Sequence, residues 1–99
     1  MPRKYSVTAS TAAAYKLELT SGAEKDLSLL PKTILKIVDG RILALAEDPR
    51  PSGVKKFKGP RPFYRIRAGS YRVVYLVDDS SRTVTVARVR HRKEVYRGL

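Results

Sequence analysis

The chain has 99 residues and no cysteine, and both facts limit the sites it can build. This length suits one compact domain and leaves little core for a deep, preformed cofactor cavity. The lack of cysteine excludes thiolate zinc sites, disulfides and thiol nucleophiles, and the single histidine excludes a multi-histidine metal site. No apolar run reaches the ~18–20 residues of a membrane span. We expect a soluble, cytoplasmic protein without a cofactor, a metal or a membrane partner.

The 21 basic and 9 acidic residues give a net charge of +12, and the excess lies in one half of the chain. Residues 1–54 carry a net charge of +2, whereas residues 55–99 carry +10. Such a concentration favours a polyanionic partner, either nucleic acid, an acidic protein, or both. Anionic lipid is a weaker candidate, because the basic residues alternate with apolar ones and form no amphipathic helix.

Residues 1–14 show no apolar period, and we treat them as an N-terminal arm whose order the sequence leaves uncertain. The rest of the chain, residues 15–99, is predicted to be a single domain. It opens with residues 15–20, in which apolar and polar side chains alternate. This period of two predicts a half-buried strand.

Two helices are predicted to follow this strand. Ser21 and Glu24 have the spacing of a capping box, which predicts a short helix from there to about Leu30. Pro31 suits the first turn of a second, longer helix that ends near residues 48–49. The second helix carries one apolar stripe, formed by Ile34, Leu35, Val38, Ile42 and Leu45.

The second half of the chain is rich in β-forming residues. Residues 50–62, rich in proline and glycine, are predicted to form a loop with at most one short strand. Three β-rich runs follow over residues 62–68, 71–78 and 83–91, joined by turns of hairpin length. The order of strand, two helices and three-stranded antiparallel meander predicts an α+β fold with the helices packed on one sheet face. The opposite face is expected to stay open.

Arginines concentrate on the predicted meander. Period-two geometry places Arg65 and Arg67 on one face of their strand, with Arg72 one hairpin turn away and Arg88 and Arg90 together on the last strand. A planar guanidinium suits phosphate, although basic residues on a strand face can also be merely solvated. We expect the five groups to converge on the open face, with loop lysines as nucleic-acid contacts at its rim: Lys55, Lys56 and Lys58.

The aromatic residues of this half allow two interpretations. Phe57 and Phe63 are either core plugs or stacking platforms for an unpaired base. The core face of the central strand is most simply formed by four residues of one parity: Tyr71, Val73, Tyr75 and Val77.

Several segments carry the motifs of a known family. They are Lys56-Phe57-Lys58-Gly59, Tyr64-Arg65-Ile66-Arg67, Gly69-Ser70-Tyr71-Arg72-Val73-Val74-Tyr75 and His91-Arg92-Lys93-Glu94-Val95-Tyr96. Together with the end of the second predicted helix, Leu45 to Pro49, these segments resemble the RelE/ParE family of bacterial type II toxins. The resemblance covers about residues 15–97.

The resemblance implies a small mRNA endonuclease that cuts in the ribosomal A site, inhibits translation and is silenced by a co-encoded antitoxin. Well-studied ribosome-dependent members carry lysines where this chain has Arg65 and Arg67. The family's basic positions carry over to Arg65, Arg67, Arg72 and Arg92. Its loop contacts carry over to Lys56 and Lys58, and its C-terminal tyrosine carries over to Tyr96.

Cleavage of RNA without a metal ion requires a ribose 2′-hydroxyl to attack the adjacent phosphodiester, with one proton removed, the developing charge neutralised and the 5′-oxygen protonated. Arginine cannot accept the proton, because its pKa lies above ~12. His91, Tyr96 or a loop lysine therefore remain as acceptors. Histidine has the ordinary pKa nearest neutrality, but His91 shares its parity with Val89, so a half-buried histidine at a strand end is the alternative.

Two other functions fit the same sequence. A ParE-like member would keep this fold but poison DNA gyrase by binding it, and a basic nucleic-acid-binding module would carry no catalysis. The retained basic positions and the C-terminal tyrosine favour the endoribonuclease, whereas the two missing lysines count against it. A toxin of this charge also predicts an acidic or amphipathic antitoxin segment across the basic face or in place of residues 92–97.

Overall fold

The computed structural model describes residues 15–60 and 62–95, so residues 1–14 and Tyr96 lie outside the described part. No helix in that part is long and apolar enough to cross a membrane. The elements follow the predicted α+β order, with one short C-terminal helix added: β1 (Lys16–Leu19), α1 (Ser21–Ser28), α2 (Lys32–Leu45), β2 (Lys55–Phe57), β3 (Phe63–Ala68), β4 (Tyr71–Asp78), β5 (Thr83–His91) and α3 (Arg92–Val95).

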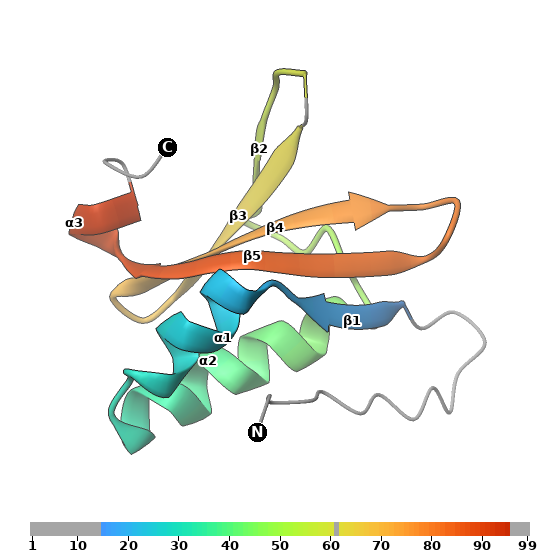
Figure 1. Cartoon of the computed structure of the whole chain (residues 1–99). Coiled ribbons are helices and arrows are strands. Elements are labelled where there is room, and N and C mark those ends of the chain that lie inside the picture. The colour runs from blue at the N-terminus through green and yellow to red at the C-terminus, as the bar shows by residue number, and fades with distance from the viewer. Residues whose placement is uncertain (1–14, 61, 96–99) are drawn as a thin grey trace.

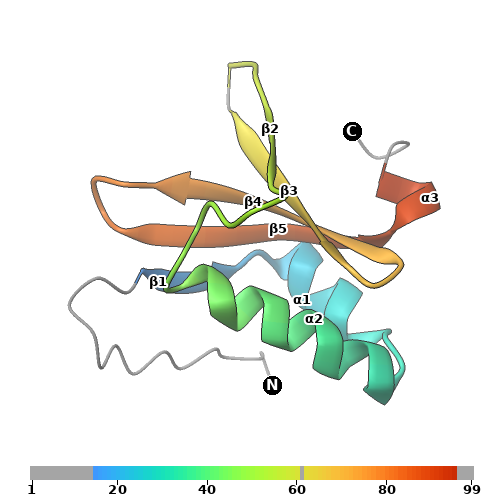
Figure 2. The same cartoon turned by 180° about the vertical axis from the view of Figure 1, so that it is seen from behind.

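The strands form one five-stranded mixed sheet in the order β1-β5-β4-β3-β2. Strands β2 to β5 pair antiparallel, as the predicted meander requires, and β1 adds to β5 in parallel. Helices α1 and α2 lie together on one side of the sheet, and the β2–β3 hairpin projects away from β4 and β5 (Figures 1 and 2). The prediction that the helices cover one sheet face is therefore confirmed.

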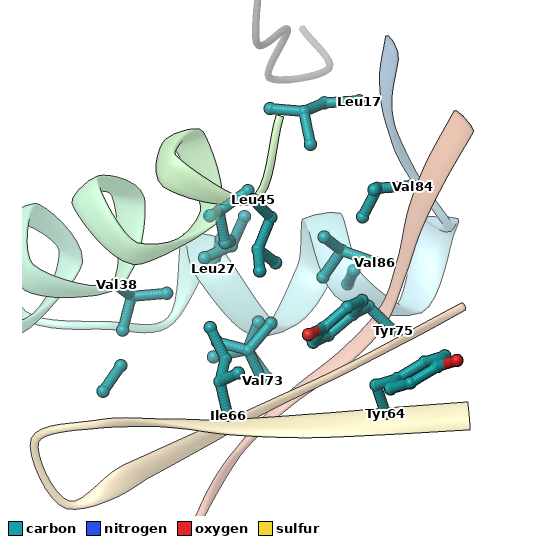
Figure 3. Close-up of a cluster of buried hydrophobic side chains, with 14 of the residues drawn as sticks. Leu17, Leu27, Val38, Leu45, Tyr64, Ile66, Val73, Tyr75, Val84 and Val86 are labelled. Carbon is teal, nitrogen blue, oxygen red and sulfur yellow. The ribbon is translucent and has the colours of Figure 1, made fainter. Parts of the chain in front are cut away.

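The core lies between the helices and the sheet. Val38, Ile42 and Leu45 of the predicted stripe are at most 1% exposed. They belong to one buried cluster with Val73 and Tyr75 of the central strand β4, both fully buried (Figure 3). Burial of each such side chain contributes about 1.5–3 kcal/mol, so this layer holds the helices to the sheet.

Polar bonds fasten the loop after α2 to the sheet. The Tyr75 hydroxyl donates to the carbonyl of Pro49 at 2.7 Å, and burial raises the pKa of this phenol. The Arg50 guanidinium donates two bonds to the Asp79 carboxylate, and the Tyr15 hydroxyl donates another. The Arg50 bonds, followed by that of Tyr15, lower the pKa of Asp79 to about 2. These bonds thus fix the position of the chain before it enters the β2–β3 hairpin.

Helix α1 is capped one residue earlier than predicted. Its N-cap is Thr20, whose hydroxyl oxygen accepts from the Ala23 amide at 3.1 Å, so the predicted capping box that starts at Ser21 is wrong. The amide of Thr20 donates to the Val86 carbonyl, which keeps Thr20 in the extended conformation that an N-cap needs. The same threonine hydroxyl donates to the Ala87 carbonyl at 2.8 Å. One side chain therefore joins α1 to β5.

Strand β5 contains an irregularity that reverses the direction of its side chains. Val74 pairs with Arg88, whereas the next residue, Tyr75, pairs with Val86. Ala87 is therefore an extra residue, the mark of a β-bulge. Because one extra residue shifts the alternation by one, Val86 faces the core while Arg88 faces away from it.

Helix α1 covers the edge of β5 beyond the last residue that pairs with β1. The Asp26 carboxylate accepts from the Val89 amide at 2.9 Å and from the Arg88 guanidinium at 2.9 and 3.1 Å. The Nε of Arg90 lies 3.6 Å from the same carboxylate. The Asp26 contact raises the pKa of Arg88. One acid thus satisfies an edge amide and compensates two cations.

We expect Thr20→Val to lower the free energy of unfolding by about 1–2 kcal/mol, because α1 loses its cap and the Ala87 carbonyl loses a donor. Thr20→Ser keeps the hydroxyl and should retain most of the stability. Equilibrium unfolding in denaturant measures both variants. A Thr20→Val chain as stable as Thr20→Ser would contradict the role given to the hydroxyl.

Asp26→Ala is expected to cost about 2–3 kcal/mol of unfolding free energy, since the Val89 amide loses its acceptor and two arginines lose their counter-ion. Glu24→Ala removes a carboxylate from the first turn of the same helix and should cost less than about 1 kcal/mol. Denaturant unfolding and hydrogen exchange of the Val89 amide measure the difference. Equal losses in both variants, with unchanged protection of that amide, would show that Asp26 does not hold the edge.

Candidate anion-binding site

Three neighbouring strands carry arginines on the sheet face away from the helices. The register pairs Arg67 with Arg72 and Arg72 with Arg90, which places the three side by side in one row. Arg65 and Arg88 are both paired with Val74 in the next row. Directly paired residues share a face, so all five arginines leave the same face of the sheet. The guanidinium groups of Arg65, Arg67 and Arg72 meet at one cavity. Those of Arg88 and Arg90 turn to Asp26 of α1 and line the second cavity, so the predicted convergence does not include them. Like charges placed opposite one another destabilise a sheet, and a bound anion would relieve this repulsion.

A cavity of about 350 Å³ lies at the edge of β3. Strand β2 pairs with β3 only as far as Arg65, and no other described strand covers the edge beyond it. Among the described residues that line the cavity, every charged side chain is a cation, which suits an anionic ligand. The lining consists of Arg41, Ser52, Gly53, Lys55, Arg65, Ile66, Arg67 and Arg72.

Arg65 lies in the wall of this cavity but is itself buried, with 6% of its surface exposed. Its guanidinium carbon lies 5.0 Å from the centre of the Phe57 ring. Phe57 in turn stacks on Phe63, with ring centres 4.8 Å apart and planes 7° from parallel. The two phenylalanines therefore form an aromatic stack on the arginine face, and the cation–π contact fixes the guanidinium plane of Arg65.

The structure separates the three loop lysines. Lys55 lines the cavity beside Arg65. Lys56 points to the opposite side of β2, because successive strand residues alternate, and its Nζ lies 5.8 Å from the centre of the Tyr64 ring. Lys58 is exposed just beyond the end of β2. The expectation that the three lysines share one rim is therefore wrong for Lys56.

His91 lies on the face opposite the arginine row. It pairs with Tyr71, and the two rings meet edge to face with centres 5.4 Å apart. Its Nδ1 accepts from the Lys93 amide at 3.3 Å. His91 lines a second cavity, of about 360 Å³, between α1 and the end of β5. The alternative interpretation of a half-buried histidine at a strand end is therefore the one the geometry supports.

The remaining predicted residues lie at the C-terminal end of the described chain. Arg92 is exposed and begins α3, and its amide donates to the carbonyl of Ser70 in the β3–β4 turn at 2.8 Å. This bond brings the start of α3 close to the strand that carries Arg72. Tyr96 lies outside the described residues.

The sequence interpretation missed Arg41, which comes from α2 and not from the meander. Its Nε donates to the carbonyl of Arg67 at 3.0 Å, and its side chain lines the cavity. Arg41 lies three residues after Val38 and next to Ile42, so it borders the buried stripe of α2. A basic residue at the border of a helix stripe was the available signal, because such residues lie near the edge of the sheet that the helix covers.

The fold and the motifs have clear relatives. A model of the ParE toxin of the type II toxin-antitoxin system parDE matches residues 17–96. Toxin RelG of Mycobacterium tuberculosis is 33% identical over 84 residues, which cover 84% of this chain and 97% of RelG.

Solved structures show the same similarity. The RelE-RelB complex of the archaeon Pyrococcus horikoshii contains a chain with 26% identity and a TM-score of 0.72, over 80% of this chain and 96% of that one. The isolated RelE toxin of E. coli has 27% identity and a TM-score of 0.69, over 87% of this chain and 100% of that one. Because sequence, fold and arginine motifs agree, the chain belongs to the RelE/ParE family and is a toxin of a type II toxin–antitoxin system.

Proposed function

We propose that this toxin is an endoribonuclease that cuts mRNA in the ribosomal A site and is held inactive by a cognate antitoxin. The observation that carries the proposal is the cavity at the edge of β3, whose described charged lining consists of cations. A phosphodiester under attack gains negative charge, and cations already in place stabilise that charge without reorganisation.

In this proposal the 2′-hydroxyl of the ribose attacks the adjacent phosphorus, the bond to the 5′-oxygen breaks, and a 2′,3′-cyclic phosphate remains on the upstream fragment. Arg67 and Arg72, which are paired across β3 and β4, bind the non-bridging oxygens. Arg65 adds a buried charge whose field is less screened than that of an exposed arginine. A separate group takes the 2′-proton, because arginine stays protonated, and the departing 5′-oxygen takes up a proton to leave as a hydroxyl.

The cognate antitoxin is the second part of the proposal. Structures of relatives include a RelE-RelB complex from Pyrococcus horikoshii and a RelBE2 toxin-antitoxin complex from Mycobacterium tuberculosis. A chain with a net charge of +12 and a row of paired arginines favours an acidic partner. We propose that an acidic or amphipathic antitoxin segment covers the arginine face or takes the place of residues 92–97.

A ParE-like poison of DNA gyrase is the second candidate function, and the match to a model of ParE toxins favours it. A toxin that acts by binding gyrase has no need of a cation-lined cavity for a phosphodiester. The two functions also leave different damage in the cell, since one cuts translated mRNA and the other breaks DNA.

Cleavage of a defined mRNA on programmed ribosomes tests the proposal. We expect a cut at the A-site codon, and we expect Arg72→Ala to lower the single-turnover rate by about 10²–10³. Its unfolding free energy should change by less than about 1 kcal/mol, because Arg72 lies on the sheet face away from the core. Lys32→Ala, an exposed charge at the start of α2, is the matched control and should cleave like the wild type.

Two results would contradict the proposal. A folded Arg72→Ala toxin with full cleavage rate would show that the arginine face is not the site. Intact mRNA, together with DNA breaks trapped on gyrase, would establish the ParE-like function instead.

The proton acceptor gives a further prediction. Since His91 faces away from the arginine row, His91→Gln should retain the cleavage rate within about threefold of the wild type. Tyr96→Phe keeps the ring but removes the ionisable hydroxyl, and we expect it to cost at least about 10² in rate, the scale of general acid–base catalysis. Single-turnover rates between about pH 6 and 9 compare the two. A larger loss in His91→Gln than in Tyr96→Phe would overturn this assignment.

A further inference from the structure

Helix α2 reaches the sheet edge that forms the cavity. The backbone of β3 beyond Arg65 has β4 on one side and no described strand on the other. Arg41 of α2 donates its Nε to the carbonyl of Arg67 on this open side, at 3.0 Å. The helix layer and the sheet layer therefore meet at one hydrogen bond in the cavity wall.

The bond leaves most of the Arg41 guanidinium for another acceptor. A guanidinium has five N–H donors in a planar fork, and the Nε donor binds the Arg67 carbonyl. Arg41 is exposed and lines the cavity with Arg67 and Arg72. The hydrogen bond from Nε holds the Arg41 guanidinium beside Arg67 and Arg72. Because the side chain is already partly fixed, it loses less conformational entropy when it binds an anion.

The loop on the same side of the cavity turns at a glycine. Gly53 has a φ of +85°, a left-handed conformation that residues with a side chain adopt only with strain. Together with Ser52 it forms the cavity wall between α2 and Lys55. With a volume of about 350 Å³, the cavity matches the lower end of small-ligand sites and has room for one nucleotide phosphate and its sugar.

We propose that Arg41 binds an RNA phosphate, so that α2 and the open edge of β3 together form a phosphate subsite. The inference rests on the proposed function, which it deepens by adding a contact from the helix layer to those from the sheet. The alternative is that Arg41 only shields the edge of β3, for which its one bond to the Arg67 carbonyl would suffice.

Salt dependence of RNA binding separates these roles. The probe is an RNA oligonucleotide with 2′-O-methyl groups, which binds but cannot be cleaved, measured between about 50 and 200 mM salt. We expect Arg41→Ala to weaken binding about tenfold and to reduce the slope of log Kd against log salt by about 0.7, the loss of one single-strand phosphate contact. Arg41→Lys keeps the charge and should keep most of the slope.

Lys36→Ala is the matched control. Lys36 is exposed on the same helix, five residues before Arg41 and therefore about 140° around the helix axis, and it does not line the cavity. It should leave the slope unchanged. Equal slopes for Arg41→Ala and Lys36→Ala, with tight binding by the wild type, would overturn the phosphate subsite and leave the proposed function standing.

A titration with inorganic phosphate distinguishes failure of the phosphate subsite from failure of the proposed function. When phosphate is titrated into the ¹⁵N-labelled chain, the subsite predicts shifts of the Arg41 Nε–H and of the Gly53 amide. In Arg41→Ala, the shift of the Gly53 amide should be smaller. A wild-type chain that leaves mRNA intact on programmed ribosomes would contradict the proposed function. Absence of these shifts would overturn the subsite, whatever the chain does to RNA.

Discussion

The Ala87 bulge, held at its carbonyl by Thr20, determines on which face of the sheet the arginines of β5 lie. Before the bulge, Val84 and Val86 face the helices and are fully buried. After it, Arg88 has the same parity in the sequence but faces the other way. Without the extra residue, the arginines of β5 would point into the core, where an uncompensated guanidinium costs several kcal/mol. Because Thr20 also caps α1, one side chain contacts both the start of the first helix and the bulge of β5.

Once the arginines share a face, their mutual repulsion must be offset locally. The structure does this in three ways. The Asp26 carboxylate compensates Arg88 and lies near Arg90. The stack of Phe57 and Phe63 supports Arg65 through its ring face. Backbone carbonyl oxygens accept hydrogen bonds from the guanidinium groups of Arg41 and Arg72. Burial of the apolar layer between the helices and the sheet supplies the folding free energy that outweighs the remaining repulsion between the arginines. The arginines are therefore already in position before an anion binds.

Local periodicity was sufficient to predict the strands and the two main helices, because each depends on neighbours a few residues apart. The face on which Arg88 and Arg90 lie depends on the Ala87 bulge, which alternation does not reveal. Contacts between distant segments were not predictable in this way. The N-cap lies at Thr20 because β5 holds its amide, and Arg41 reaches the cavity because α2 crosses the edge of β3. Lys56 was misassigned because the loop becomes strand β2, whose alternation turns that side chain away from the cavity.

The central claim is that a phosphodiester binds in the cavity between α2 and the open edge of β3. The most direct measurement is a crystal structure of the toxin with an RNA oligonucleotide that a 2′-O-methyl group protects from cleavage. The account predicts a phosphate within hydrogen-bond distance of Arg41, Arg67 and Arg72. A phosphate bound instead in the second cavity, beside His91 and Lys25, would contradict it.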